Sequence, residues 1–192
     1  MIELSKPAQR AELRAARDGF VLDLTGEQRA RLEARAAANL MPLIEKARCV
    51  AFYHGLGGEL GCGPAITAAA ARGIAVALPH VAGRHQAMRF LSWAPGNPLE
   101  TGWRGLQQPL GDTPELIPDV IVTPLLGFDS TLARLGQGAG FYDRAFAERP
   151  VAAKIGFGWS IQRVPVIACD PWDVRLDAVV TEAGTIGKGE QR

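Results

Sequence analysis

The stretch Val120–Arg144 reads VIVTPLLGFDSTLARLGQGAGFYDR and joins a short apolar run to a glycine cluster. The run at 120–122 has the length and β-branched content of a buried strand. Glycines at 136, 138 and 140 come directly after Arg134 and directly before a segment that we expect to be helical. Glycine lets backbone N–H groups approach an anion, and a helix N-terminus adds oriented N–H groups and a positive dipole end. This order predicts a phosphate-binding loop, with a tight turn after a strand as the alternative.

Two well-known phosphate motifs are excluded by the spacing of these glycines. No Gly-Lys-Ser/Thr follows them, so the loop is not a Walker A motif. The third glycine comes too soon for the dinucleotide-binding fingerprint. The loop therefore predicts phosphate chemistry without naming a nucleotide.

Outward from this stretch, helical segments alternate with short apolar strands. Helices are expected at 5–18, 25–46, 64–72 and 140–148, with Ser5 and Thr25 as N-caps and Gln28 completing a capping box. Strands are expected at 49–53, 74–78, 88–93, 119–122, 154–157, 164–168 and 178–181, with 95–118 irregular and 184–192 frayed. The pattern predicts a single α/β domain over residues 1–192: a three-layer, mostly parallel sheet with helices on both faces. Ligands bind at the carboxyl ends of such strands, so we expect Glu59, His80 and the glycine cluster at one edge.

The composition is that of an ordinary globular protein. Hydrophobic residues make up 47%, charged residues 21%, and the net charge is +1, so no global field predicts nucleic acid as a partner. No apolar run reaches the length of a membrane span, and the N-terminus lacks a signal-peptide core. Three scattered cysteines predict neither disulfides nor a zinc site, which favours a cytoplasmic location; a monomer is the default expectation. The three histidines are expected in loops or on pocket rims, and a three-histidine metal site is a weaker alternative.

Some charged residues could serve such a loop. Lys6 and Arg10 lie four residues apart on the first helix, so both face one side and could clamp a polyphosphate. The alternative is a solvated face shared with Arg14 and Arg17, which we favour when that spacing is taken alone.

Three carboxylates also need interpretation. Asp143 falls in the first turn of the helix after the glycines and either complements the dipole or holds Mg²⁺. Asp173 is expected in a turn. Glu59 lies in a glycine-rich loop after a buried strand, and is either an ordinary exposed side chain or a partner for an NH-rich heterocycle such as a pterin or purine.

The sequence resembles the 5-formyltetrahydrofolate cyclo-ligase (5,10-methenyltetrahydrofolate synthetase) family. The central resemblance is Val122–Asp129 followed by Arg134-Leu135-Gly136-x-Gly138-x-Gly140-Phe141-Tyr142-Asp143. The flanking matches fall in the family's order: Lys6-x-x-x-Arg10, Gly57-Gly58-Glu59, Leu78-Pro79, Phe90–Trp93 and Asp173-x-x-x-Asp177–Glu182. The resemblance covers nearly the whole chain.

The resemblance implies an enzyme, an ATP- and Mg²⁺-dependent carbon–nitrogen cyclo-ligase of one-carbon metabolism. It would convert 5-formyltetrahydrofolate to 5,10-methenyltetrahydrofolate by phosphoryl activation of the formyl oxygen and ring closure by N10. Implied catalytic residues are Lys6, Arg10, Arg134 and Tyr142, the first two on the ATP phosphates. The implied nucleotide loop comprises Arg134, Gly136, Gln137, Gly138, Ala139, Gly140, Phe141 and Tyr142. Implied folate contacts are Glu59, Met88, Gly138 and Tyr142, and implied Mg²⁺ ligands are Asp143 and Asp173.

The chain departs from the family pattern at several positions. Gly58 stands where Ser is usual, and Gln137, Ala139 and Phe141 replace an aromatic or basic residue, a Gly or Lys, and a Tyr. The pair 132–133 replaces a Gly plus another residue. These changes bear on rate and nucleotide affinity more than on fold, and they leave a non-catalytic folate- or nucleotide-binding paralogue as the alternative. A further alternative is a related α/β enzyme for a sugar phosphate or coenzyme A, which needs no Lys6 or Arg10.

Overall fold

The chain folds around one large sheet in a computed structural model that describes residues 5–84, 86–149 and 152–187. Within these residues the sheet has seven strands in the order β11-β10-β9-β6-β1-β2-β3. The neighbours from β10 to β2 run parallel, and the two edge strands β11 and β3 run antiparallel to their partners. The strands are β1 Cys49–Ala51, β2 Ala75–His80, β3 Arg89–Ser92, β6 Val120–Pro124, β9 Ala153–Phe157, β10 Ala178–Thr181 and β11 Gly184–Gly187.

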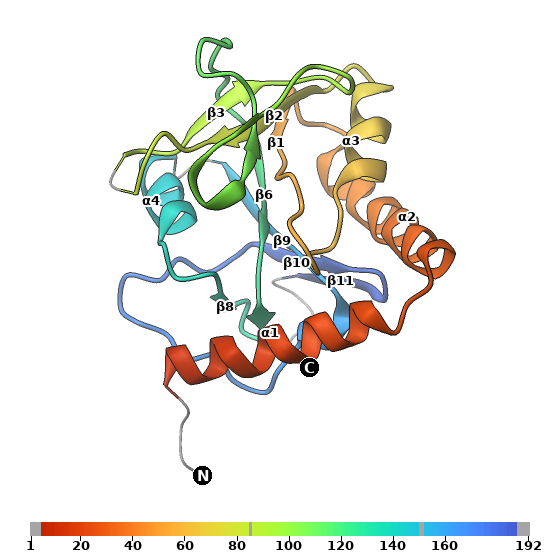
Figure 1. Ribbon diagram of the computed structural model, residues 1–192, viewed down its shortest axis with the longest axis vertical. Helices are drawn as coiled ribbons and strands as arrows, with labels where there is room; N and C mark the ends of the chain where they lie inside the picture. The colour runs from red at the N-terminus through yellow and green to blue at the C-terminus, as the bar shows by residue number, and fades with distance from the viewer. Residues whose placement is uncertain (1–4, 85, 150–151, 188–192) are drawn as a thin grey trace.

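Helices cover both faces of this sheet (Figure 1). Alternate strand residues face opposite sides: Val50 and Val122 pack in the cluster with α2 and α3, while Ala51 and Ile121 pack in the cluster with α4. The predicted three-layer α/β architecture is thereby confirmed. The helices are α1 Lys6–Leu22, α2 Gly26–Ile44, α3 Gly63–Ala70 and α4 Phe141–Glu148, with 3₁₀ turns η1 Trp103–Gly105 and η2 Ser160–Gln162.

Helix α1 runs across the carboxyl end of β6 (Figure 1). Its apolar side holds it there, because Leu13 is buried against the small hairpin of β7 Gly127–Phe128 and β8 Arg134–Leu135. A Cβ on Gly127 would lie 2.6 Å from Leu13 Cδ1, so glycine is required for this contact. The hairpin loop is fixed by buried Asp129, which accepts hydrogen bonds from the backbone N–H groups of residues 131, 133 and 167. The hairpin therefore connects the carboxyl end of β6 to α1 through buried contacts.

Several local predictions need correction. Residues 164–168 do not form a strand: the N–H groups of Val164 and Ile167 go to Phe128 O and Asp129 Oδ2, which leaves only an isolated bridge at Arg163. The segment 184–187, expected to be frayed, is the edge strand β11. Residues 188–192 lie outside the described part.

Two further local expectations are corrected and one is confirmed. The region 95–118, expected to be irregular, contains a short hairpin of β4 Glu100–Thr101 and β5 Gln107–Gln108. Ser5 occupies the N-cap position of α1, but its side chain makes no capping hydrogen bond. The capping box of Thr25 and Gln28 is confirmed, with both reciprocal hydrogen bonds formed. None of the described helices has the length and apolarity needed to span a bilayer.

Candidate active site

A cleft of about 940 Å³ opens at the carboxyl ends of the strands and under α1. Its volume is in the range of sites that enclose a small-molecule ligand. Its walls come from α1, the loop after β1, the end of β2, the end of β6 and the glycine loop that leads into α4. Among the described residues, seven lining side chains are Lys or Arg: Lys6, Arg10, Arg14, Arg17, Arg104, Arg134 and Arg144. The cleft is therefore suited to an anionic ligand.

The structure brings nearly all the predicted site residues to this one cleft. Those that line it are Lys6, Arg10, Glu59, Met88, Arg134, Gly136, Gln137, Gly138, Ala139, Gly140, Phe141, Tyr142, Asp143 and Asp173. Arg14 and Arg17 of the same face of α1 also line the cleft, Arg14 as an exposed side chain and Arg17 as a buried one. The spacing 6, 10, 14, 17 puts all four cations on one helix face, and this signal was available in the sequence.

The expectation that the histidines lie in loops or on pocket rims is only partly confirmed. His54 lines the cleft as expected, but His80 does not. His80 is the buried last residue of β2, with Nε2 3.3 Å from Glu100 Oε1, because β2 continues through Pro79 and pairs with β3. His85 lies outside the described residues.

The glycine loop is tied to α1 by two arginines. Arg10 Nε donates to Gly136 O at 3.0 Å, and Arg14 Nη2 donates to Gln137 Oε1 at 2.7 Å. Gly138 has φ +96°, and a Cβ there would lie 3.3 Å from Arg10 Cζ. Gly140 has φ +67° at the N-cap of α4. Ala139 is not among the residues with positive φ, so its side chain fits this loop without backbone strain.

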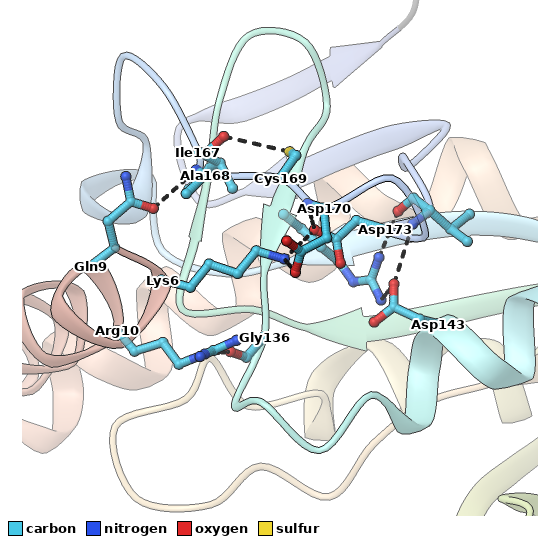
Figure 2. Close-up of polar contacts among 12 residues, drawn as sticks. Lys6, Gln9, Arg10, Gly136, Asp143, Ile167, Ala168, Cys169, Asp170 and Asp173 are labelled. Atoms are coloured by element: carbon cyan, nitrogen blue, oxygen red, sulfur yellow. Dashed lines mark hydrogen bonds and ion pairs between the residues drawn. The ribbon is translucent and has the colours of Figure 1, made fainter. Parts of the chain in front are cut away.

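Lys6 joins α1 to the segment that carries Asp173. Its Nζ donates to Asp170 Oδ2 at 2.6 Å and to Asp173 Oδ2 (Figure 2). Burial by itself lowers the pKa of Lys6, but the hydrogen bonds and negative charges of the two aspartates outweigh it, and the pKa is raised. For Asp173, burial raises the pKa, and the hydrogen bond from Lys6 with the other contacts outweighs it, so the pKa is lowered. Both groups are held in their charged forms.

Arg134 forms a second ion pair in the cleft, with Asp143. Its Nη2 donates to Asp143 Oδ1 at 2.9 Å and its Nη1 donates to Val174 O at 2.7 Å, while the guanidinium stacks on Phe146. Val174 N also donates to Asp143 Oδ1 at 3.3 Å. The N-terminus of α4 is thereby fastened to the segment 170–174, and Asp143 points from α4 toward it (Figure 2). Two carboxylates with cationic partners, Asp143 and Asp173, thus lie on adjoining segments of the cleft wall.

Glu59 and Tyr142 also line the cleft, and the pKa of each is raised. Burial raises the pKa of Glu59, although the Leu56 N–H, the Gln137 amide and the charge of Arg17 oppose the shift. Gln137 Nε2 lies 3.3 Å from Glu59 Oε1. Burial, and next the charge of Glu59, raise the pKa of Tyr142, which therefore remains a neutral hydroxyl. Met88 is buried in the same wall.

Mg²⁺ is bound in proteins by one or two carboxylates together with substrate phosphates and water. Asp143 and Asp173 supply hard oxygen donors of this kind. No group of three or more His, Cys, Asp or Glu side chains suited to a metal occurs in the part of the chain that the structure describes. Asp143 and Asp173 therefore fit the share of such a Mg²⁺ ligand set that a protein supplies.

Comparisons with known proteins agree on one family. Residues 2–182 match the model of the 5-formyltetrahydrofolate cyclo-ligase family. The 5-formyltetrahydrofolate cyclo-ligase of Escherichia coli K12 is 32% identical over 170 residues, which cover 82% of this chain and 92% of that protein. The solved structure of 5,10-methenyltetrahydrofolate synthetase from Aquifex aeolicus superimposes with a TM-score of 0.77 at 28% identity, covering 95% of this chain and 94% of the other. The Mycoplasma pneumoniae synthetase, at 22% identity and a TM-score of 0.73 over 93% of this chain and 99% of the other, shares the fold.

Proposed function

Because this chain belongs to the 5-formyltetrahydrofolate cyclo-ligase family, we propose that the cleft under α1 holds ATP and the folate side by side during ring closure. The chain is an ATP-dependent folate ligase that converts 5-formyltetrahydrofolate to 5,10-methenyltetrahydrofolate. What we propose beyond the family is the assignment of residues, the use of Mg²⁺, the cytoplasmic location and the monomeric state. The observation that carries the assignment is the convergence of α1 cations, glycine loop and Glu59 on one cleft.

The phosphates of ATP bind between α1 and the glycine loop. Lys6 and Arg10 supply positive charge from the helix, and Gly138 and Gly140 supply backbone N–H groups at the N-terminus of α4. The support is the Arg10 bond to Gly136 O, which fixes the loop relative to the helix. Each charge-assisted contact of this kind contributes about 1.5–3 kcal/mol.

Mg²⁺ is held by Asp143 and Asp173 together with phosphate oxygens. Bound MgATP supplies a γ-phosphoryl group that turns the formyl oxygen into a good leaving group. Arg134 positions Asp143, and Lys6 keeps Asp173 ionised until phosphate arrives. The catalytic contribution of the chain is therefore positioning and charge neutralisation, which dominate in phosphoryl transfer.

The folate binds with its pterin at Glu59. A buried carboxylate accepts hydrogen bonds from the N–H groups of a pterin edge, and Met88 and Tyr142 give the ring an apolar wall with one hydroxyl. Gly138 lies where the two ligands meet. The non-catalytic alternative is not favoured, since a binding protein has no use for both a phosphate clamp and paired carboxylates.

The test is to mix the purified protein with 5-formyltetrahydrofolate and follow the near-ultraviolet absorbance of the methenyl product. The absorbance should grow only when ATP and Mg²⁺ are both present. Growth without ATP, or without a divalent cation after chelation, would refute the assigned chemistry.

A further inference from the structure

Arg17 is a cleft residue whose guanidinium is only partly used. It lies on α1 and is 5% exposed. Its Nε and Nη2 both donate to Asp18 Oδ1, at 2.9 and 2.8 Å. Its Nη1 is buried and has no hydrogen-bond partner among the described residues. A buried unpaired donor on a charged group is costly, so an acceptor is missing from the unliganded chain.

The Arg17–Asp18 pair packs against the loop that carries Glu59. A Cβ on Gly58 would lie 2.5 Å from Asp18 Oδ1 and 3.1 Å from Arg17 Nε, so the pair fills the space of a side chain at position 58. The loop is held in place by Trp159, whose Nε1 donates to Gly58 O at 2.9 Å. This accounts for the glycine where the family's loop usually has Ser. Arg17 is thus fixed next to Glu59, close enough for its charge to act on that carboxylate.

The side chains of Glu59 and Arg17 together present a hydrogen-bond acceptor beside a donor. Glu59 accepts hydrogen bonds through its carboxylate, and Nη1 of Arg17 can donate one more. The pterin ring has the complementary edge, since its 2-amino and N3–H donors adjoin the 4-oxo acceptor. A cationic donor for that oxygen also neutralises part of the charge of the buried Glu59.

We propose that Arg17 is a substrate-binding residue whose Nη1 donates to the 4-oxo group of the pterin while Glu59 accepts from the adjacent N–H groups. This inference rests on the proposed function. Because water does not reach Nη1 in the free chain, entry of the pterin must move the groups that cover it. Asp18 is the positioning residue, because it engages Nε and Nη2 and leaves the Nη1 nitrogen without a partner among the described residues.

The experiment is calorimetric titration of 5-formyltetrahydrofolate, without ATP, into the wild type and two variants. Arg17→Gln replaces the cationic donor by a shorter, neutral amide, and Gly58→Ala displaces the pair through its Cβ while the Arg17 side chain itself is unchanged. Both should bind the folate about ten- to a hundredfold more weakly, the loss expected for a charge-assisted hydrogen bond. ATP binding should stay within about twofold. Arg35→Gln, which removes a charge from an exposed position on α2, is the matched control and should bind both ligands normally.

Two analogues locate the contact on the substrate. The wild type should prefer the 4-oxo compound to its 4-amino-4-deoxy analogue, and Arg17→Gln should lose most of that preference. The loss in Arg17→Gln should persist with 5-formyltetrahydropteroate, which lacks the glutamate. If it disappears with that compound, Arg17 binds the glutamate carboxylate and the proposal is wrong. The proposal is also wrong if both variants bind the folate like the wild type, whereas a wild type that fails to bind the folate overturns the proposed function itself.

Discussion

The alternating glycines allow a prediction that separates two chemically identical substitutions. Gly138 has φ +96°, and a Cβ there would lie 3.3 Å from the Arg10 guanidinium carbon. Gly136 has an ordinary φ, and its Cβ would meet nothing within 4 Å. Alanine is therefore strained at 138 and accommodated at 136, although the two positions are two residues apart in one loop.

The size of the effect follows from the backbone. A left-handed conformation costs an L-residue about 1–2 kcal/mol, so Gly138→Ala drives the free loop toward a negative φ that turns the neighbouring N–H groups away. ATP must then restore the original conformation as it binds, which weakens affinity roughly five- to thirtyfold. The crowded Arg10 contact adds to this loss. Gly136→Ala should leave ATP affinity within about twofold.

The assay is calorimetric titration of MgATP into each variant, with the thermal unfolding midpoint as a check on folding. Equal losses in Gly136→Ala and Gly138→Ala, or an unchanged affinity in Gly138→Ala, would falsify the view that the positive φ is what the loop requires. Ordinary affinity with a lowered midpoint in Gly138→Ala would show that the strain is present but unrelated to the nucleotide.

Three further predictions concern the charged residues of the cleft. Arg10→Ala should weaken the binding of ATP by about 1.5–3 kcal/mol, measured as a rise in the KM for ATP. Arg35→Ala is the control, and equal effects in the two variants would contradict the phosphate assignment. Asp143→Asn should raise the Mg²⁺ concentration needed for half-maximal rate by tenfold or more, and an unchanged Mg²⁺ requirement would remove Asp143 from the metal site. The lowered pKa of Asp173 and the raised pKa of Lys6 mean that their ion pair stabilises the fold above the ordinary Asp value of 3.8 and below the ordinary Lys value of 10.5. The difference in unfolding midpoint between wild type and Asp173→Asn should therefore shrink as pH falls below about 4 and as it rises above about 10.5, and a constant difference across pH would contradict the pairing.

Much of the site could be predicted because its residues sit at sequence positions with strong local signals. The glycine loop between a strand and a helix, and the four-residue spacing of Lys6 and Arg10, are both readable without coordinates. The spacing did not decide whether that helix face meets solvent or a ligand. Tertiary packing decides where that face lies: Leu13, four residues before Arg17 on the same side of α1, is buried against the hairpin, and this contact brings the neighbouring cations to the cleft.

Contacts between residues distant in sequence could not be predicted. Nothing local pairs Lys6 with Asp173, Arg134 with Val174 O, or Gln137 with Glu59. The prediction of a strand at 164–168 was wrong for the same reason. Its apolar composition suits a strand, but its N–H groups donate to the hairpin of β7 and β8 and to Gln9 on α1.

The sequence by itself determined the α/β class, the family and the position of the glycine loop before a helix, because periodicity, glycine spacing and helix starts are local properties of the chain. Tertiary structure alone decided which charges face each other across the cleft and which donor is left without a partner. Those outcomes depend on how α1 crosses the strand ends, and the free energy that fixes this crossing comes from buried contacts between segments more than a hundred residues apart.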